Sequence, residues 1–176
     1  MTRRAAGVPV PIRAADDSFQ PTVAEMTAAI TDKTKVVLLN SPSNPSGKVF
    51  DGDWLRAVIR YCEERDIFVL LDDIYHRLVF DGHKAVHCYE CTDRSVDDAK
   101  LVVLNGVSKQ YAMTGFRIGW AVGPSDLIKV MANIQSHQSG NPCSLSQHAA
   151  VAAIHGAQGS VKALRETLQK LSLIHI

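Results

Sequence analysis

Three short aliphatic runs, each followed at once by a cluster of polar residues, constrain the fold of this chain more than any other feature. The runs cover residues 36–39, 67–71 and 101–104, and none of them alternates between apolar and polar side chains. Unbroken aliphatic and β-branched runs of this length are typical of strands buried on both faces, as in a parallel sheet. We therefore expect these three runs to be strands of one parallel sheet.

The segment between the first two runs has the periodicity of an amphipathic helix. Its apolar side chains recur at helical spacing from Asp53 to Arg65, and Asp53 suits the N-cap or the first turn. Strand, helix and strand in this order predict an α/β fold, with a mostly parallel sheet flanked by helices.

The second half of the chain contains one further strand pattern and three helical patterns. We expect a strand over residues 117–122 and helices over about 126–135, about 144–154 and from residue 161 onward. No internal repeat or low-complexity linker divides the 176 residues, which favours one domain. The last five residues supply no helix stop, and we expect the sequence to be cut there.

The polar clusters fall directly after the three predicted strands. They cover residues 40–47, 72–75 and 105–109. Ligands of open parallel sheets bind beyond the carboxyl ends of the strands. The clusters therefore predict one ligand site at that edge of the sheet.

The charge balance gives no support for a polyanionic partner. Nineteen basic residues face eighteen acidic ones, for a formal net charge of +1, so we expect neither nucleic acid nor an anionic membrane surface as a partner. The longest apolar runs are far too short to span a bilayer. We expect a cytoplasmic protein.

The cysteines raise the question of a metal site. Cys88 and Cys91 form a C-x-x-C pair just after His83 and His87, but there is no second pair of sulfur ligands to complete a usual zinc site. We expect reduced surface thiols and no metal.

Three motifs resemble those of a known family. They are GVSKQYAMTGFRIG at residues 106–119, SPSNPSG at 41–47 and DDIY at 72–75, and they occur in the family's order. Together they resemble class I/II aminotransferases of pyridoxal-phosphate (PLP) fold type I, most like the bacterial aspartate aminotransferase branch. The resemblance runs from about residue 7 to about residue 169.

The resemblance implies an enzyme that moves an amino group between an amino acid, with aspartate as our guess, and a 2-oxo acid. Its cofactor would be pyridoxal 5'-phosphate, held by a Schiff base to Lys109, which would also shuttle the substrate's proton. Both tasks need an amine that can lose its proton near neutral pH, which lysine can do and arginine cannot.

The resemblance also implies partners for the other parts of the cofactor. Asp72 would keep the pyridine nitrogen protonated, and its neighbour Asp73 is the competitor for this role. Tyr75 and Asn44 would bond the phenolic oxygen, and the Asn44–Pro45 peptide bond is expected to be cis. The less specific alternatives are a helix N-cap for Asp72, a boundary tyrosine and an ordinary turn asparagine.

The phosphate would meet a cation. Arg117, at the start of the fourth predicted strand, would hold it by a bidentate contact, with Ser108 as a lesser candidate. The alternative for Arg117 is an exposed salt bridge. Glycine at position 106 departs from branches that place a hydroxyl there. His76 could face the site, but we expect it to be partly exposed and non-catalytic.

Relative to complete family members, the N-terminal part of the large domain and the C-terminal small domain are expected to be absent from residues 1–176. Family members form homodimers, so we expect the full-length protein to be a homodimer and this fragment to be inactive alone. A PLP-dependent lyase or decarboxylase of the same fold, or a PLP-sensing regulatory domain of a transcription factor, stays open, because the anchoring residues serve all three.

Overall fold

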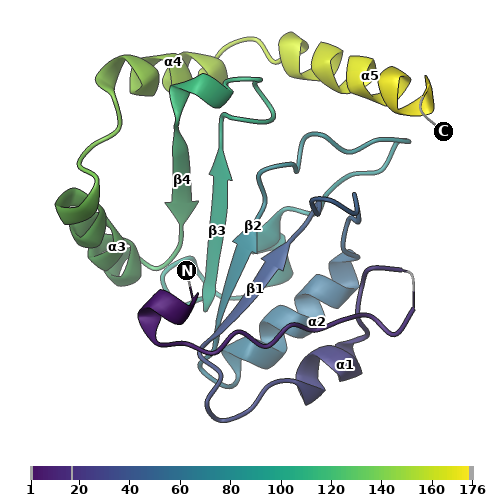
Figure 1. Cartoon of the computed structure of the whole chain (residues 1–176), viewed down its shortest axis with the longest axis vertical. Helices are drawn as coiled ribbons and strands as arrows, with labels where there is room; N and C mark the ends of the chain where they lie inside the picture. Colours follow the sequence, from purple (N-terminus) through teal and green to yellow (C-terminus); the bar gives the residue numbers. More distant parts are fainter. Residues whose placement is uncertain (1, 17, 175–176) are drawn as a thin grey trace.

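The computed structural model describes residues 2–16 and 18–174; of the last five residues, His175 and Ile176 therefore lie outside it. A four-stranded sheet forms its centre, with strands β1 (Val36–Asn40), β2 (Phe68–Asp72), β3 (Leu101–Gly106) and β4 (Gly119–Val122) in that spatial order. The first three strands are parallel and β4 is antiparallel to β3. This confirms the predicted mostly parallel α/β sheet (Figure 1).

Five helices and three short turns accompany this sheet in the described residues. They are α1 (Val23–Ala28), α2 (Gly52–Glu63), α3 (Ser125–Gln138), α4 (Ser144–His155) and α5 (Gly159–Ile174), with short 3-10 turns η1 (Thr2–Ala5), η2 (Cys88–Cys91) and η3 (Thr114–Phe116). The four predicted helices are thus confirmed, whereas α1 was not predicted. Helix α1 has a capping box, in which Thr22 and Glu25 bond each other's backbone N–H groups.

Helix α2 is the crossover between β1 and β2, and its apolar stripe packs against the sheet. Asp51 is its N-cap, accepting from the backbone N–H groups of Asp53 and Trp54 at 2.9 and 3.1 Å, so Asp53 occupies the first turn. Ile59 and Cys62 are fully buried against the sheet residues Val69 and Leu71. This layer is the hydrophobic core.

The strands are not all buried on both faces as predicted. In β1, Val37 and Leu39 are buried under α2, but Val36 and Leu38 on the opposite face are 55% and 68% exposed. Only β3 is buried along nearly its whole length. The expectation failed for β1 because only one of its faces has a helix packed against it among the described residues.

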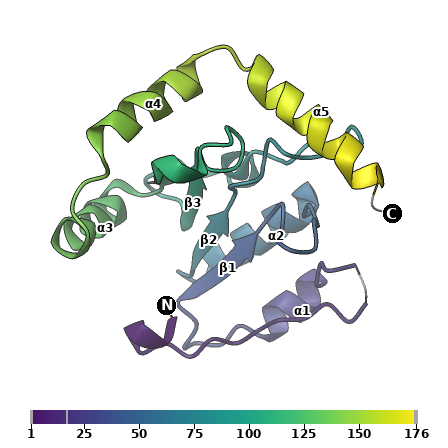
Figure 2. The same ribbon diagram turned by 45° about the horizontal axis from the view of Figure 1, so that its top comes forward.

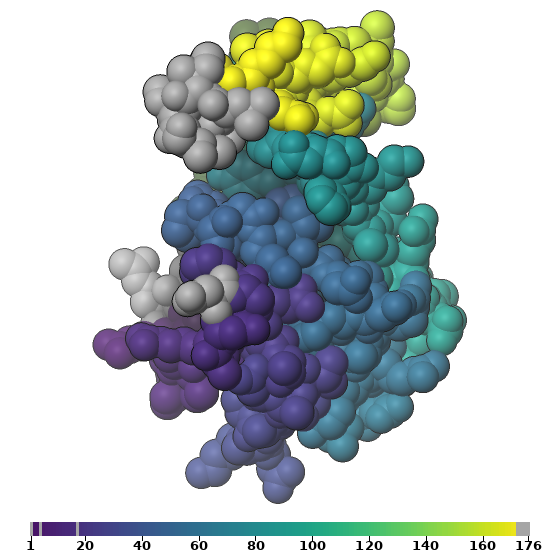
Figure 3. Space-filling view, turned by 90° about the vertical axis from the view of Figure 1, so that its right-hand side faces the viewer, coloured from purple at the N-terminus to yellow at the C-terminus, as the bar shows by residue number. Residues whose placement is uncertain are grey.

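The last two helices lie across the carboxyl ends of β1, β2 and β3 (Figures 1 and 2). The segment that follows β2 contacts this layer, because Gln169 on α5 donates to Asp81 at 3.0 Å. In space-filling view α5 sits at one end of the molecule, directly above teal-coloured residues (Figure 3). Helices α4 and α5 therefore form one boundary of the region beyond the strand ends.

The two faces of the sheet give a test of the core. Replacing Leu71, which is 1% exposed, by alanine should lower the free energy of unfolding of this chain by roughly 2–5 kcal/mol, because it leaves a cavity under α2. Leu38→Ala, in the neighbouring strand, is the matched control and should change it by less than about 0.5 kcal/mol. Urea denaturation followed by circular dichroism measures both, and equal losses would contradict the assignment of the core.

Candidate functional site

A pocket of about 610 Å³ opens beyond the carboxyl ends of the parallel strands. All six residues singled out in the sequence line it, together with three that were not. Its lining consists of Asn40, Asn44, Asp72, Ile74, Tyr75, Ser108, Lys109, Thr114 and Arg117. The sheet register brings them together, because Asn40 at the end of β1 lies opposite Asp72 at the end of β2.

Asp72 ends β2 with its backbone and its carboxylate both engaged. Its backbone oxygen accepts from the side chain of Asn40 at 3.2 Å and from the N–H of Ser41 at 3.1 Å. Its Oδ1 accepts from the N–H of Ile74 at 3.2 Å. A turn follows rather than a helix, so the alternative role as a helix N-cap is wrong.

Asp73, the competitor of Asp72, points away from the pocket. It is 7% exposed, and its carboxyl contacts Asn105 and the thiol of Cys88. Burial raises the pKa of Asp73 to about 7, against the smaller lowering effect of these two contacts. Its carboxyl therefore lies in the interior, away from the pocket that Asp72 lines.

The loop after β1 brings Asn44 to Tyr75. The Oδ1 atom of Asn40 accepts from the backbone N–H of Asn44 at 2.8 Å, and the Asn44 side chain donates to the Tyr75 hydroxyl at 3.5 Å. The expected cis bond between Asn44 and Pro45 is present, and a second one joins Ser41 to Pro42. An amide and a phenol therefore meet at one wall of the pocket.

Lys109 lies on the loop after β3 and is exposed toward the pocket. Its Nζ atom is 5.6 Å from the centre of the Tyr75 ring. The fully buried Val107 anchors this loop, and its N–H donates to the oxygen of Ile118 at 3.2 Å. A side chain at Gly106 would meet the same oxygen, since a Cβ there would lie 2.8 Å from it. The backbones at Gly106 and Ile118 approach so closely that only glycine fits at position 106.

Arg117 lies outside the fourth strand, contrary to prediction. The strand begins at Gly119, where pairing with Gly106 starts, and Arg117 has a left-handed backbone with φ of 55°. Its guanidinium donates to the backbone oxygen of Thr114 at 2.8 Å. No carboxylate pairs with it among the described residues, which argues against the alternative of an exposed salt bridge and leaves its other N–H groups available.

Three lining residues, Asn40, Ile74 and Thr114, were not predicted from the sequence, and they differ in whether the sequence carried a signal for them. Asn40 is part of the first polar cluster, so its place at a strand end was a usable signal. Ile74 and Thr114 lie inside recognised motifs but carry no distinctive chemistry. Their positions in the lining follow from the turns that hold Tyr75 and Arg117.

The cysteines are placed differently from the prediction. Cys62, Cys88 and Cys91 are buried and Cys143 is exposed, so the expectation of surface thiols is wrong for Cys88 and Cys91. Burial raises the pKa of Cys62 to about 11. Across residues 2–16 and 18–174, no cluster of three or more histidine, cysteine or acidic side chains is arranged to hold a metal ion.

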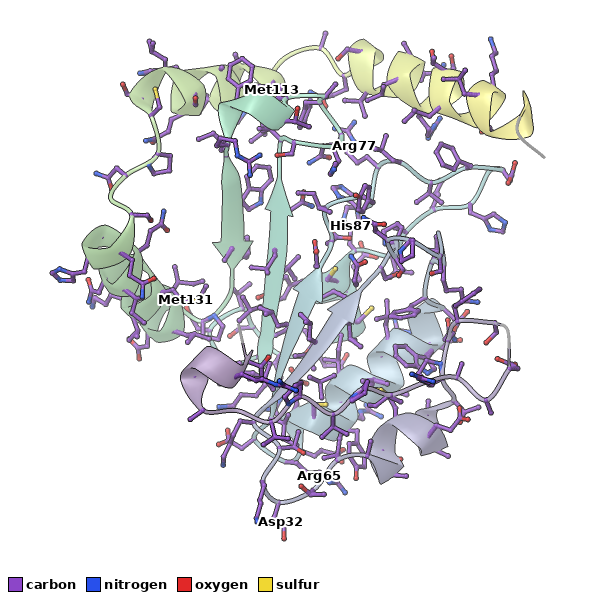
Figure 4. All side chains as sticks on the ribbon, viewed as in Figure 1. Asp32, Arg65, Arg77, His87, Met113 and Met131 are labelled. Carbon is purple, nitrogen blue, oxygen red and sulfur yellow. The ribbon has the colours of Figure 1, made fainter. Side chains whose placement is uncertain are left out.

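The two ends of the sheet carry different side chains. Arg77 and His87 lie beyond the carboxyl ends of the strands, whereas Asp32 and Arg65 lie at the opposite end (Figure 4).

None of the helices in the described part of the chain has both the length and the apolar character needed to cross a bilayer.

The chain matches known proteins over nearly its whole length. Residues 2–173 match the family described as aminotransferase class I and II. The chain is 39% identical over 173 residues to an aspartate aminotransferase of Geobacillus stearothermophilus, covering 97% of this chain and 44% of that one. It is also 39% identical to an asparagine–oxo-acid transaminase of Streptococcus mutans, covering 93% and 42%.

Solved structures of such enzymes share the fold. The aspartate aminotransferase of Rhizobium meliloti superposes with a TM-score of 0.86 at 40% identity, covering 93% of this chain and 41% of that one. The Thermus thermophilus aspartate aminotransferase with maleate gives 0.83 at 32% identity, covering 96% and 42%. The chain therefore spans less than half of the length of these relatives.

The buried carboxyl of Asp73 predicts a pH effect on stability. Because its pKa is raised from 3.8 to about 7, its stabilising contribution is complete below about pH 4 and is lost as the pH rises to 7. The side chain of Asp73→Asn stays neutral, so the variant should lack this loss. The free energy of unfolding of the variant minus that of the wild type should therefore increase by on the order of 2–4 kcal/mol between about pH 5 and about pH 8.

Urea denaturation at both pH values measures this difference. The control is Asp93→Asn, whose side chain is 91% exposed and which should follow the wild type at each pH. A stability loss in Asp73→Asn that is the same at both pH values would contradict the assignment.

Proposed function

Because the chain belongs to the family of class I and II aminotransferases, we propose that the protein transfers an amino group between an amino acid and a 2-oxo acid, with pyridoxal 5'-phosphate as its cofactor. Enzymes of this family depend on that cofactor. Since the chain spans about two fifths of its relatives' length, the activity is proposed for the whole protein and not for these 176 residues alone.

One observation carries the proposal: a carboxylate at the end of β2 lines the same pocket as an amine and a guanidinium from the connection between β3 and β4. These are the groups that the aldehyde, the ring nitrogen and the phosphate of the cofactor would require. The pocket volume of about 610 Å³ is within the range of small-molecule sites, which is about 300–1,000 Å³. The residues present therefore fit the cofactor.

Lys109 would have two tasks. Its Nζ atom would bond the aldehyde carbon and would later move the proton of the substrate's Cα. Its exposure toward the pocket and the buried anchor at Val107 support this role, because the amine is accessible on a loop that is held in place.

Asp72 would hold a proton on the ring nitrogen. When bound, the protonated ring supplies an electron sink for the charge that develops at the substrate's Cα. The carboxylate of Asp72 has one oxygen bonded to a backbone N–H, which orients it and leaves the other oxygen free for such a contact. Because Asp73 points away from the pocket, Asp72 is the better candidate of the two for the contact with the ring nitrogen.

The remaining pocket residues would orient the cofactor. Tyr75 and Asn44, already in contact with each other, would both bond the phenolic oxygen. Arg117 would bind the phosphate, with its guanidinium held by the oxygen of Thr114, and Ser108 would contribute a second, smaller contact.

The amino donor is proposed to be aspartate. Aspartate aminotransferases are prominent among the relatives, and the Thermus thermophilus structure contains maleate, a dicarboxylate. An asparagine–oxo-acid transaminase shares the same identity, so asparagine is the competing donor. We also propose that the whole protein is a homodimer, since α3 and α4 expose apolar side chains such as Val130, Ile134 and Leu145.

The role of Lys109 can be tested by covalent labelling. Borohydride reduction of the full-length protein with PLP should leave the cofactor attached to the peptide that contains Lys109. Lys109→Ala should lose the label and reduce transfer by roughly 10²–10⁴-fold from the missing proton transfer alone. Lys129→Ala, on the surface of α3, is the control and should behave as wild type; label on another lysine in the wild type would overturn the assignment.

Arg117 gives a separate test of the phosphate contact. Arg117→Gln should weaken PLP binding by roughly 10–100-fold, because a charge-assisted hydrogen bond contributes about 1.5–3 kcal/mol. It should weaken binding of pyridoxal, which lacks the phosphate, much less. Fluorescence titration of the full-length protein measures both affinities, with the exposed Arg60→Gln as the matched control. Equal losses for both ligands would refute the phosphate contact.

A further inference from the structure

A buried polar network lies behind the pocket and joins the turn that follows Asp72 to the loop that carries Lys109. Its centre is Asn105, in β3, which is 8% exposed. The side chain of Asn105 reaches the turn at Asp73 and His76 on one side and the loop at Gly106 and Gln110 on the other. None of these five residues lines the pocket itself.

Backbone groups fix the orientation of the Asn105 amide. Its Oδ1 atom accepts from the N–H of Gly106 at 2.7 Å, and its Nδ2 atom donates to the backbone oxygen of Asp73 at 3.0 Å. A backbone N–H can only donate and a backbone oxygen can only accept, so turning the amide over would break both bonds.

The Nδ2 atom has two further neighbours, the Asp73 carboxyl at 3.4 Å and the imidazole of His76. The Nδ1 atom of His76 lies 2.9 Å from Nδ2 of Asn105. The same Nδ1 lies 3.3 Å from the backbone oxygen of Asp73, a contact that would need a proton on Nδ1. The contact with Asn105 is the shorter of the two, and since the asparagine is the donor there, it favours a neutral imidazole with its proton on Nε2. A protonated His76 would place one N–H against another.

The surroundings of His76 favour the neutral form. Its side chain is 22% exposed, and burial lowers its pKa, aided by His87 and Arg77 and opposed by the contact with the backbone oxygen of Asp73. The carboxyl of Asp73 lies 3.6 Å from Nδ1 but is itself protonated over much of the acidic range, because burial raises its pKa. The titratable and charged groups near the imidazole are Asp73, Arg77, His87 and, through its contact with Asp73, Cys88.

On the side of the Lys109 loop, the network holds the residues next to Lys109 through hydrogen bonds of Gln110. Gln110 donates both to Oδ1 of Asn105 and to the backbone oxygen of Gly106, each at 3.1 Å. Lys109 lies between Gly106 and Gln110 in the chain. A shift of the Asn105 amide would therefore move the loop that determines the position of the Lys109 amine.

We propose that Asn105 is a positioning residue that holds the Lys109 loop against the Asp72 turn, and that it does so only while His76 is neutral. This inference rests on the proposed function, because the position of Lys109 matters only if it bonds the cofactor. Protonation of His76 turns the amide, removes the acceptor of the Gly106 N–H and loosens the loop.

The network can be tested first without the cofactor. Hydrogen exchange at the Gly106 amide, corrected for intrinsic rates, should speed up by roughly tenfold as the pH falls from about 8 to about 5, as expected for loss of one hydrogen bond. Nitrogen NMR of the full-length protein should report the Nε2–H tautomer for His76 at the upper pH. The opposite tautomer, or exchange that does not change with pH, would overturn the proposal.

Two variants of His76 separate the hydrogen bond from general packing. His76→Asn offers an oxygen near the position of Nδ1 that cannot be protonated, so slow exchange at Gly106 should persist at low pH. His76→Leu has no acceptor, and exchange should be fast at every pH. His83→Asn, an exposed histidine of the same segment, is the control and should match the wild type.

The effect on Lys109 is read from the cofactor-loaded full-length protein. The titration midpoint of the visible absorbance of lysine-bound PLP should shift in His76→Leu and return toward wild type in His76→Asn. Fast exchange in His76→Leu with an unchanged midpoint would show a merely structural network and overturn the positioning role. Absence of this absorbance in the wild type would instead overturn the proposed function, and the positioning role with it.

Discussion

The parallel pairing of β1, β2 and β3 is the constraint on which the rest of this structure depends. Parallel strands end at the same edge of a sheet, so the loops that follow them meet whatever their separation in sequence. Asn40, Asp72 and Lys109 lie far apart along the chain, yet they line one pocket. The apolar layer between α2 and the sheet stabilises this register and thereby holds the pocket together.

The strand ends also share a hydrogen-bonding device. Asn40 and Asn105, from the strands on either side of β2, each donate a side-chain N–H to one backbone oxygen of the aspartate pair. Each also accepts a backbone N–H through Oδ1, from Asn44 in the loop after β1 and from Gly106 at the end of β3. The two amides thus fasten three loops to one another, and a site built in this way is pre-organised before a ligand binds.

The neighbouring aspartates show how burial divides two like residues. Asp72 faces the pocket as a candidate partner for a cation, whereas Asp73 is enclosed by Asn105 and Cys88 and its pKa is raised. Alternation along an extended chain sends successive side chains to opposite faces. One residue is thereby available for chemistry and the other for the supporting layer.

The sequence by itself determined the strands, the helices α2 to α5 and the six residues gathered at the pocket, because these follow from local periodicity and from motifs at strand ends. Only the tertiary structure decided the contacts of Asn105 and His76, the burial of Cys88 and Cys91, the exposed face of β1 and the turn at Arg117. The physical reason is range: the hydrogen bonds of Asn105 to Asp73 and of Asn40 to Asp72 each join residues 32 positions apart. Such contacts exist only once the strands are paired, so no local pattern encodes them.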